Sequence, residues 1–303
     1  MTTGFEAPLT AWYAANARDL PWRRSGAGAW PILVSEVMLQ QTPVSRVLPA
    51  YEAWLARWPT AAALAAATPA DAVRQWGRLG YPRRAIRLHG CAEVITARHG
   101  GRVPYSIDEL RTLPGVGSYT AAAVASFAFG QRHAVLDTNV RRVLARLVTG
   151  SELSPRSSAS VAETKLAESL LPPAAANRAA TWSVAVMELG ALVCTAARPA
   201  CDRCPLAADC AWRRNGSPAA QARRPAQRYK GTDRQCRGAV LAVLRAAPGP
   251  VPVRTLDACW PDAGQLTRVL ATLLADELAS EHAGGLIGLP GDQPSLAPAA
   301  SGE

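Results

Sequence analysis

Four of the seven cysteines in the chain follow a fixed spacing near residue 200. Cys194, Cys201, Cys204 and Cys210 are arranged as C-x6-C-x2-C-x5-C. Thiolates are soft ligands that suit zinc or an iron–sulfur cluster. Structural zinc usually binds two close cysteine pairs, and only one C-x2-C is present. The spacing therefore favours a [4Fe–4S] cluster, with zinc as the alternative.

Glu36 is a second candidate for chemistry. It lies in the apolar stretch "PILVSEVMLQQ", which we expect to be helical. Apolar surroundings solvate a carboxylate poorly, so they favour the neutral acid and raise its pKa, as a general acid requires. The alternative is an ordinary glutamate on a helix surface, which the neighbouring Val34, Val37 and Met38 disfavour.

Asp137 stands directly before a helix expected over 138–149. Aspartate often occupies this N-cap position because its carboxylate accepts a hydrogen bond from the first helical turn. A cap is also held rigidly, so capping does not exclude a chemical role. Arg141, Arg142 and Arg146 follow on the same helix, where we expect either phosphate contacts or a solvated face.

The stretch "LPGVGSYTAAAVASFAFG" predicts a tight bend followed by a helix. Gly115 and Gly117 allow backbone conformations and close approaches that a side chain would block. A helix beginning near Ser118 offers unpaired N–H donors and the positive end of its dipole. In a basic, helical chain this bend is a candidate cradle for a DNA phosphate, although a plain turn between packed helices is the alternative.

The rest of the chain must position these groups, and its periodicity predicts an all-α fold. We expect helices at 8–18, 31–41, 44–57, 69–77, 82–99, 106–112, 118–129, 138–149, 159–170 and 177–193.

The C-terminal part has a different composition. Residues 213–232 are rich in Arg, Gly, Pro and Ala and are expected to form a linker. Residues 233–290 read as three helices and a hairpin through Gly284 and Gly285, which is the order of a winged helix. We expect residues 291–303 to be a disordered tail.

The formal net charge is +10, and only two of the basic residues are lysine. Guanidinium groups bind phosphate through a planar fork of donors, so nucleic acid is a candidate partner. The N-terminus does not resemble a signal peptide, and the alanine-rich runs are too short to span a bilayer. We expect a cytoplasmic protein, bacterial and associated with the nucleoid through DNA, in which thiols stay reduced.

Several motifs together resemble one family. "LPGVGSYTA" is similar to the helix-hairpin-helix signature of the base-excision DNA glycosylases, and "VLDTNVRRV" is similar to their catalytic-aspartate segment. "SEVMLQQT", "LPWR" and "GRLGY" resemble the MutY-type adenine-DNA glycosylases within the endonuclease III superfamily. The resemblance covers roughly residues 8 to 212.

This resemblance implies a fold of two helical domains with a cluster loop. The cluster domain would comprise 1–22 and 136–212, and the helix-hairpin-helix domain would comprise 23–135. The cysteine spacing is the one that this family uses for a [4Fe–4S] cluster. Its expected role is structural, since it would hold a loop carrying Arg198 and Arg203 against DNA.

The resemblance also implies the reaction. The glycosidic bond breaks through an oxocarbenium-like state, which two carboxyl groups can promote. Glu36 corresponds to the acid that protonates adenine N7, and Asp137 to the residue that stabilises the cation at C1′, with a covalent intermediate as the alternative form of that stabilisation. Asn139 would hydrogen-bond the acid, and Tyr119 would lie near Asp137.

Tyr119 predicts the outcome at the DNA strand. In endonuclease III-like enzymes a lysine at this position attacks the sugar and then cleaves the strand. A phenol cannot form a Schiff base, so we predict a monofunctional enzyme that leaves an abasic site.

The extruded adenine must leave the duplex before it reacts. The resemblance places Gln41 and Tyr81 as wedges beside the lesion pair, although Tyr81 could also be a core residue. The full set of expected DNA-binding residues is Arg23, Gln41, Thr42, Leu79, Tyr81, Gly115 and Gly117.

Many family members carry a MutT-like domain that recognises 8-oxoguanine, whereas residues 233–290 are predicted to be helical with a small wing. Thr138 and Pro82 also differ from frequent family residues, glycine and tyrosine respectively. The expected substrate is double-stranded DNA with A:8-oxoG or A:G mispairs, bound by a monomer. A thymine–guanine mismatch glycosylase and a non-catalytic iron–sulfur DNA-binding protein are the alternatives.

Overall fold

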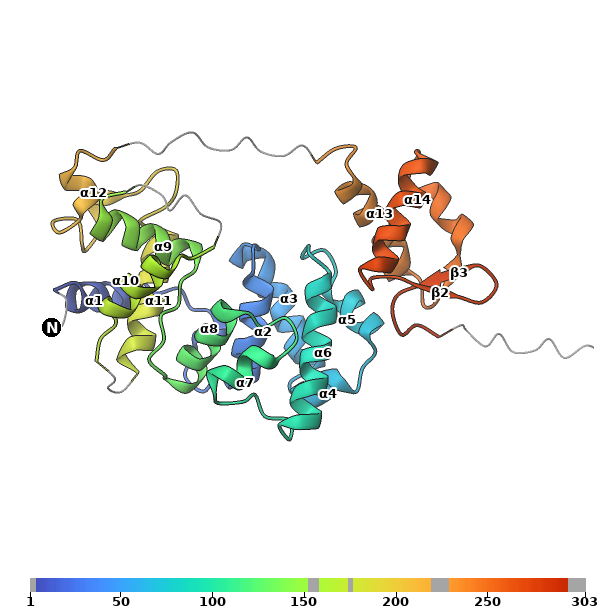
Figure 1. Ribbon diagram of the computed structural model, residues 1–303, viewed down its shortest axis with the longest axis horizontal. Helices are drawn as coiled ribbons and strands as arrows, with labels where there is room; N and C mark the ends of the chain where they lie inside the picture. The colour runs from blue at the N-terminus through green and yellow to red at the C-terminus, as the bar shows by residue number, and fades with distance from the viewer. Residues whose placement is uncertain (1–3, 152–157, 174–176, 219–228, 294–303) are drawn as a thin grey trace, which may run out of the picture. The chain divides into compact units, whose positions relative to one another are not determined.

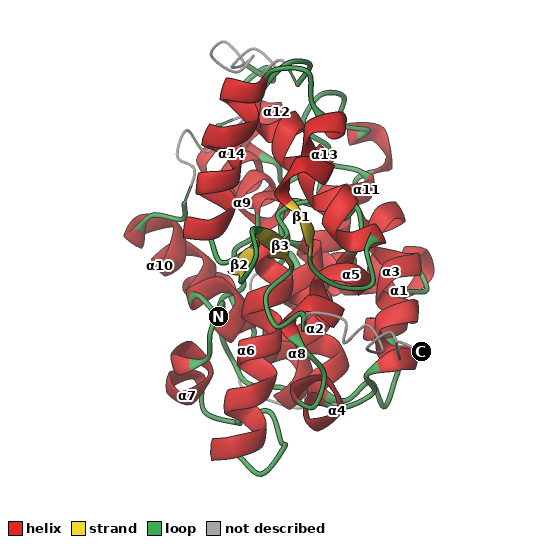
Figure 2. Cartoon of the chain, turned by 90° about the vertical axis from the view of Figure 1, so that its right-hand side faces the viewer, coloured by secondary structure: helices red, strands yellow, loops and turns green. Residues whose placement is uncertain are grey.

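A computed structural model describes residues 4–151, 158–173, 177–218 and 229–293. Helices dominate it, and within these residues strands occur only in the C-terminal part (Figures 1 and 2). The predicted all-α architecture is therefore confirmed for the body of the chain. None of the helices in the described ranges is long and apolar enough to cross a membrane.

The chain divides into two compact units, which are described separately. Unit 1 comprises residues 1–36, 104–112 and 116–224, and unit 2 comprises 37–103, 113–115 and 225–303. The domain boundaries expected from the family resemblance cut the chain at other residues and stay a prediction. Parts of the expected linker and tail, 219–228 and 294–303, lie outside the described residues.

Unit 1 is built from helices and short helical turns. Its elements are α1 (Glu6–Asn16), η1 (Pro21–Arg23), most of α2 (Ala29–Leu39), α7 (Ile107–Thr112), α8 (Ser118–Phe129), α9 (Thr138–Leu144), η2 (Ala145–Thr149), α10 (Val161–Leu170), α11 (Arg178–Leu192), η3 (Cys201–Arg203) and α12 (Ala211–Arg214).

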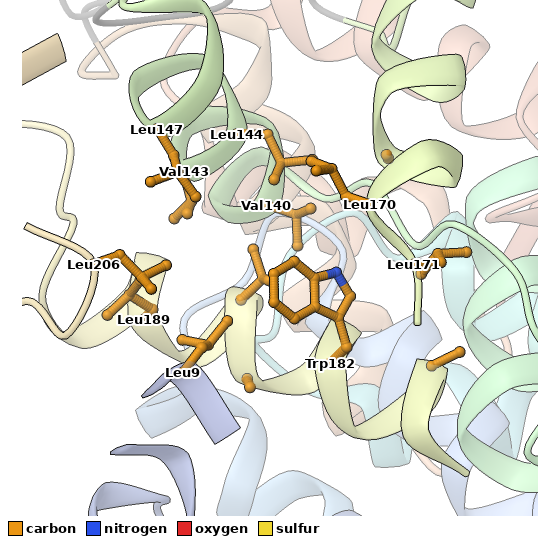
Figure 3. Packing of buried hydrophobic residues seen from close by; sticks show 14 of the residues in the cluster. Leu9, Val140, Val143, Leu144, Leu147, Leu170, Leu171, Trp182, Leu189 and Leu206 are labelled. Carbon is orange, nitrogen blue, oxygen red and sulfur yellow. The ribbon is translucent and has the colours of Figure 1, made fainter. Parts of the chain in front are cut away.

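The core of unit 1 lies between α1, α9, α10 and α11 (Figure 3). Trp182 is at its centre, with Leu9, Val140 and Leu189 among its buried neighbours. Each fully buried aliphatic side chain of this kind stabilises the fold by about 1.5–3 kcal/mol. Leu206, from the cysteine loop, joins the same core, so the loop is attached to the helices by apolar packing.

The expected helix over 138–149 changes from one helix type to another along its length. It is α-helical as α9 and continues as a π-helical turn, η2. Such turns are rare and often occur at functional sites. Here η2 packs against α12, which follows the last cysteine of the spaced set.

Unit 2 has two parts. Its first helices are α3 (Val44–Arg57), α4 (Ala61–Ala65), α5 (Pro69–Trp76) and α6 (Arg83–Arg98). Its C-terminal part contains α13 (Asp233–Ala246), β1 (Val251–Pro252), η4 (Val253–Cys259), α14 (Ala263–Ala275), β2 (Ser280–His282) and β3 (Leu286–Gly288).

The C-terminal part has the expected order of three helical segments and a hairpin. The middle segment, η4, is a 3-10 helix, and it is preceded by β1. The three strands form one antiparallel sheet in the order β1-β3-β2. The order of these elements agrees with the predicted winged helix, in which β2 and β3 would form the wing, and the assignment itself stays a prediction. The strand β1 was not predicted, because two residues are too few to show the alternation of polar and apolar side chains that marks a strand.

Candidate active site and iron–sulfur site

Glu36 lies near the end of α2 and is only 5% exposed. The helix is apolar on almost every face, and Leu33, Val34 and Val37 beside it are buried as well. The pKa of Glu36 is raised to about 7, chiefly by burial and in addition by the charge of Asp137, although the Tyr119 hydrogen bond and the charge of Arg23 lower it. Close to neutral pH, this glutamate therefore exists in part as the uncharged acid.

Tyr119 and Asp137 lie near Glu36. The Tyr119 hydroxyl donates a hydrogen bond to Glu36 Oε2 over 3.0 Å. Burial raises the pKa of Tyr119 well above its ordinary value, and the charges of Glu36 and Asp137 raise it further. The three groups thus interact electrostatically, although more than 80 residues of sequence separate Glu36 from Tyr119. The phenol stays protonated and remains a donor.

Asp137 caps α9, as its sequence position predicts. Its Oδ1 accepts a hydrogen bond from the Val140 backbone N–H at 2.7 Å, and its Oδ2 accepts one from Asn139 Nδ2 at 2.8 Å. Burial raises the pKa of Asp137, while these hydrogen bonds and the charge of Arg142 oppose the rise. The side chain is therefore fixed in orientation by its cap and by the amide of Asn139. Asn139 was expected to hydrogen-bond the acid, Glu36, whereas its amide donates to Asp137.

Gly190 on α11 makes this arrangement possible. A Cβ atom at Gly190 would lie 2.7 Å from Asn139 Cβ and 3.0 Å from the Asn139 carbonyl oxygen. Glycine therefore lets α11 and α9 approach closely enough to hold Asn139 in place. The sequence offered no sign of this requirement, because it depends on a contact between helices 50 residues apart.

Arg23 was expected at the DNA, and in the structure it has an internal partner. Its Nη1 lies 2.9 Å from Glu188 Oε2, and Arg18 binds the same carboxylate with two hydrogen bonds. Although burial would raise it, the pKa of Glu188 falls to about 2 because of Arg18 and Arg23. A contact between Arg23 and DNA stays a prediction.

Arg141, Arg142 and Arg146 were expected at phosphates or on a solvated face, and both expectations were wrong. All three are buried. Arg141 pairs with Glu163 at 2.9 Å. A guanidinium can be buried when hydrogen bonds and ion pairs compensate for the loss of water, and the helix turns these side chains inward to meet such partners. The residues organise the protein itself.

Two of these arginines bind the loop that carries the cysteines. Arg142 donates to the Cys194 carbonyl oxygen at 2.7 Å and to the Gly190 carbonyl oxygen at 2.7 Å. Arg146 donates to Cys194 Sγ at 3.3 Å and to the Thr195 carbonyl oxygen at 2.8 Å. The helix capped by Asp137 therefore also holds the start of the cysteine loop.

The four spaced cysteines are half-buried free thiols, and they lie close enough together to interact electrostatically. The pKa of Cys204 is raised to about 11, chiefly by burial and in addition by the charges of Cys194, Cys210 and Cys201, although the Leu206 backbone hydrogen bond lowers it. Four thiolates so close repel one another, and bound iron would offset this repulsion.

The donor set fits a [4Fe–4S] cluster, in which each iron takes one thiolate. Within the described ranges, no three His, Cys, Asp or Glu side chains converge on a point that could hold one metal ion. A cubane does not require such convergence, because its four ligands attach to four different irons. Arg198 and Arg203 are exposed on the loops between the cysteines, as expected for a loop that faces DNA.

The chain matches known proteins over this arrangement. The model of the HhH-GPD superfamily of base excision DNA repair proteins matches residues 34–170. An adenine DNA glycosylase from Mycolicibacterium smegmatis is 52% identical over 292 residues, covering 96% of this chain and 98% of that protein. The chain belongs to the HhH-GPD superfamily, among its adenine DNA glycosylases.

Solved structures support the same family. A thermostable thymine-DNA glycosylase has a TM-score of 0.63 and 27% identity, covering 70% of this chain and 95% of that one. A non-covalent endonuclease III–DNA complex has a TM-score of 0.56 and 25% identity, covering 69% of this chain and 92% of that one. Members of the endonuclease III and MutY group typically carry a [4Fe–4S] cluster.

The hairpin that names the superfamily has the expected bend. Gly115 has φ of 77°, a conformation that favours glycine, and a Cβ there would lie 2.9 Å from Arg87 Cβ. Gly117 is the N-cap of α8 and makes no side-chain cap. The first-turn N–H groups of α8 are therefore not capped by a side chain, as the phosphate-cradle hypothesis requires.

The expected wedge residues of this family lie in unit 2. Gln41 and Tyr81 both have positive φ, 54° and 47° respectively, which is unusual for residues with side chains. Tyr81 is 47% exposed, so the alternative that it is a core residue is wrong. Thr42 and Leu79 are buried instead, and any contact of theirs with DNA stays a prediction.

Arg84 binds the two segments that carry the expected wedge residues, 37–42 with Gln41 and 77–81 with Tyr81. The sequence analysis did not single out this arginine. Its Nη1 donates to the carbonyl oxygens of Val37, Met38 and Gln40 at 2.6–2.9 Å. Its Nη2 donates to Thr42 Oγ1 at 2.9 Å and to the Gly80 carbonyl oxygen at 3.1 Å. The residue is 7% exposed, and burial lowers its pKa to about 10. One guanidinium thus fixes the backbone at Gln41 and beside Tyr81, and no short sequence motif marks this role.

Proposed function

We propose that the protein is a monofunctional adenine-DNA glycosylase that acts on adenine mispaired with 8-oxoguanine or guanine. The observation that carries the proposal is the electrostatic grouping of Glu36, Tyr119 and Asp137, with a Glu36 pKa of about 7. The 52% identity to a protein named adenine DNA glycosylase, over nearly the whole chain, supports adenine as the base.

In the proposed reaction, the neutral carboxyl of Glu36 gives its proton to the leaving adenine. The bond between C1′ and the base nitrogen breaks, and the base leaves with its electron pair. The carboxylate of Asp137, held by Asn139 and the Val140 N–H, stabilises the positive charge that develops at C1′. Water then adds to C1′ and loses a proton, which leaves an abasic site.

Tyr119 takes the place of the lysine expected in a strand-cleaving enzyme. Its hydrogen bond to Glu36 holds the acid in position, and its phenol has no amine that could attack the sugar. In an assay with purified protein we expect base release without prompt β-elimination. Borohydride trapping at the level of a true lyase would contradict this.

Cys194, Cys201, Cys204 and Cys210 are the proposed ligands of a [4Fe–4S] cluster. When bound, the cluster supplies a covalent cross-link of the loop that carries Arg198 and Arg203. The purified protein should contain iron and acid-labile sulfide in equal amounts. Zinc without sulfide would contradict the assignment.

The substrate is tested with duplexes that contain A:8-oxoG, A:G or T:G at one position. We expect single-turnover release of adenine from the first two. Release of thymine alone would favour the activity named for the thymine-DNA glycosylase neighbour. Glu36→Gln and Asp137→Asn should each abolish release while sparing DNA binding. Release by both variants would show that these two residues are not the catalytic groups, and a parent protein that binds the duplexes but releases no base would favour a non-catalytic DNA-binding protein.

A further inference from the structure

The C-terminal part of unit 2 does not have a winged helix's usual means of binding DNA. Such modules commonly place the last helix and the wing on nucleic acid, which requires positive charge there. From residue 263 to residue 290 the sequence contains a single basic residue besides histidine, Arg268. Arg268 lies 3.5 Å from the carboxylate of Asp233. The wing turn itself, "EHAGG", contains an acidic residue and no arginine or lysine.

Most of the basic residues between 233 and 290 are instead on α13. Arg237 pairs with Asp276 at 2.6 Å, and Arg245 donates to the Gly77 carbonyl oxygen at 2.6 Å. Arg234 differs from both, because the structure gives it no ion pair among the described residues. Its guanidinium lies 5.5 Å from the ring centroid of Tyr81 and 6.0 Å from that of Tyr229.

These side chains form an alternating series of cations and rings. Arg84 lies 5.5 Å from the Tyr81 ring centroid, so the order is Arg84, Tyr81, Arg234 and Tyr229. Arg84 is buried, whereas the other three are exposed, with Tyr81 at 47% and Tyr229 at 55%. Exposed arginines between aromatic rings suit a nucleic-acid strand, since rings stack on bases and guanidinium groups bind phosphates.

Polar contacts join the C-terminal part to α5 and α6 of the same unit, close to Tyr81 in the sequence. Arg74 on α5 pairs with the buried Asp292 at 2.8 Å. Arg245 holds the carbonyl oxygen of Gly77, which begins the loop that ends at Tyr81. On α6, Arg83 reaches Asp276 at 3.1 Å. The C-terminal part therefore contacts both ends of the loop from Gly77 to Tyr81. Arg245 binds the backbone at Gly77, and Arg234 lies over the ring of Tyr81.

We propose that Arg234, from the C-terminal part, binds a backbone phosphate of the DNA strand into which Tyr81 wedges. The cation lies over the Tyr81 ring and would orient it, and the exposed guanidinium would donate to the phosphate. This part would thus extend the DNA-binding surface through α13 rather than through its wing. The proposal rests on the proposed function, because Tyr81 is at the mispair only if the protein acts on one.

The test compares Arg234→Ala with Arg254→Ala, which removes an exposed arginine of the same charge from η4. Both are made in a Glu36→Gln background so that an A:G duplex is bound without turnover. The dissociation constant is measured over a series of salt concentrations. Loss of one phosphate contact should lower the slope of log K against log salt by about 0.9 and weaken binding roughly tenfold. Arg254→Ala should keep the parent slope.

A double-mutant cycle tests the coupling to Tyr81. Tyr81→Phe retains the ring, so Arg234→Ala should have its full effect in that background. Tyr81→Leu removes the ring, and the effect of Arg234→Ala should then be smaller than in the parent. Arg234→Lys keeps the charge and should keep the parent slope, which provides a folded variant if the alanine variant is unstable.

Three results would overturn the proposal. An equal slope change in Arg234→Ala and Arg254→Ala would reflect net charge alone. Weaker binding with an unchanged slope would show that Arg234 only shapes the loop. Full additivity with Tyr81→Leu would show that the two side chains act separately. A parent protein that binds these duplexes but releases no adenine would contradict the proposed function instead, so the two failures are distinguishable.

Discussion

Glu36 and Glu188 are both buried in unit 1, yet their pKa values move in opposite directions. Glu36 has a phenol as its hydrogen-bond partner, and burial raises its pKa to about 7. Glu188 is just as buried, but Arg18 and Arg23 bind it, and its pKa falls to about 2. Burial alone therefore does not make a glutamate an acid catalyst. The charge of the neighbouring side chains decides whether a buried glutamate is protonated or forms an ion pair.

The largest expected effect is on catalysis at Glu36. Glu36→Gln keeps the size of the side chain and removes the proton that leaves with the base. We expect single-turnover adenine release to fall by about 10²–10⁴-fold, the usual contribution of a general acid. Glu52→Gln, at an exposed glutamate on α3, is the control and should retain the parent rate. A Glu36→Gln rate within tenfold of the parent would show that Glu36 is not the acid.

Glu188 should affect stability instead. Glu188→Gln leaves Arg18 and Arg23 without their carboxylate, and removing one partner of a buried pair costs about 3 kcal/mol. Arg18 is 34% exposed and can regain water, which limits the loss. Denaturant unfolding would measure it against Glu52→Gln. If the folded variant lost adenine release as completely as Glu36→Gln, the contrast between the two glutamates would be wrong.

The two glutamates should also have opposite pH signatures. Since the folded pKa of Glu36 is raised, its stabilising effect is present below about 4.5 and is lost as the pH rises through about 7. Since that of Glu188 is lowered, its effect is present above about 4.5 and is lost as the pH falls toward about 2. Unfolding of each Gln variant and the parent across this range would measure both trends. If the unfolding free energies of the two Gln variants, each relative to the parent, changed with pH in the same direction, the contrast between the two glutamates would be wrong.

Catalysis should follow the Glu36 proton. Adenine release needs the neutral acid, so the single-turnover rate should decline as the pH rises through about 7. In Glu188→Gln the decline should remain, and any movement of its midpoint should be to lower pH, because Arg23 loses the Glu188 charge and the charge of Arg23 lowers the Glu36 pKa. A rate that stays level from about one pH unit below the Glu36 pKa of about 7 to about two units above it would show that this proton has no role.

The smallest expected effect concerns Tyr119. Its hydrogen bond favours the charged form of Glu36, so Tyr119→Phe should raise the Glu36 pKa and move the alkaline decline upward. One neutral hydrogen bond is worth about 0.5–1.5 kcal/mol, which corresponds to a shift of up to about one pH unit. The pH profile of the variant measures this shift. A shift to lower pH would mean that the hydrogen bond stabilises the neutral acid.

The helical body was predictable because its elements depend on local patterns. The predicted helix over 44–57 matches α3, and 118–129 matches α8. Local signals also marked the cap at Asp137 and the bend at Gly115. The five-residue α4 was missed, since a short alanine-rich run has no distinct apolar face.

Local patterns in the sequence identify the residues that are chemically suited to their roles: an acid in an apolar helix, a capping aspartate, a tyrosine after the bend and four spaced thiols. The charge state of each glutamate depends instead on the folded arrangement. So do the inward direction of Arg141, Arg142 and Arg146 and the position of Arg84 between two loops. The reason is that electrostatic fields and buried hydrogen bonds act between groups that are neighbours in space, and a local pattern contains no information about partners such as Arg18 and Glu188, which lie 170 residues apart.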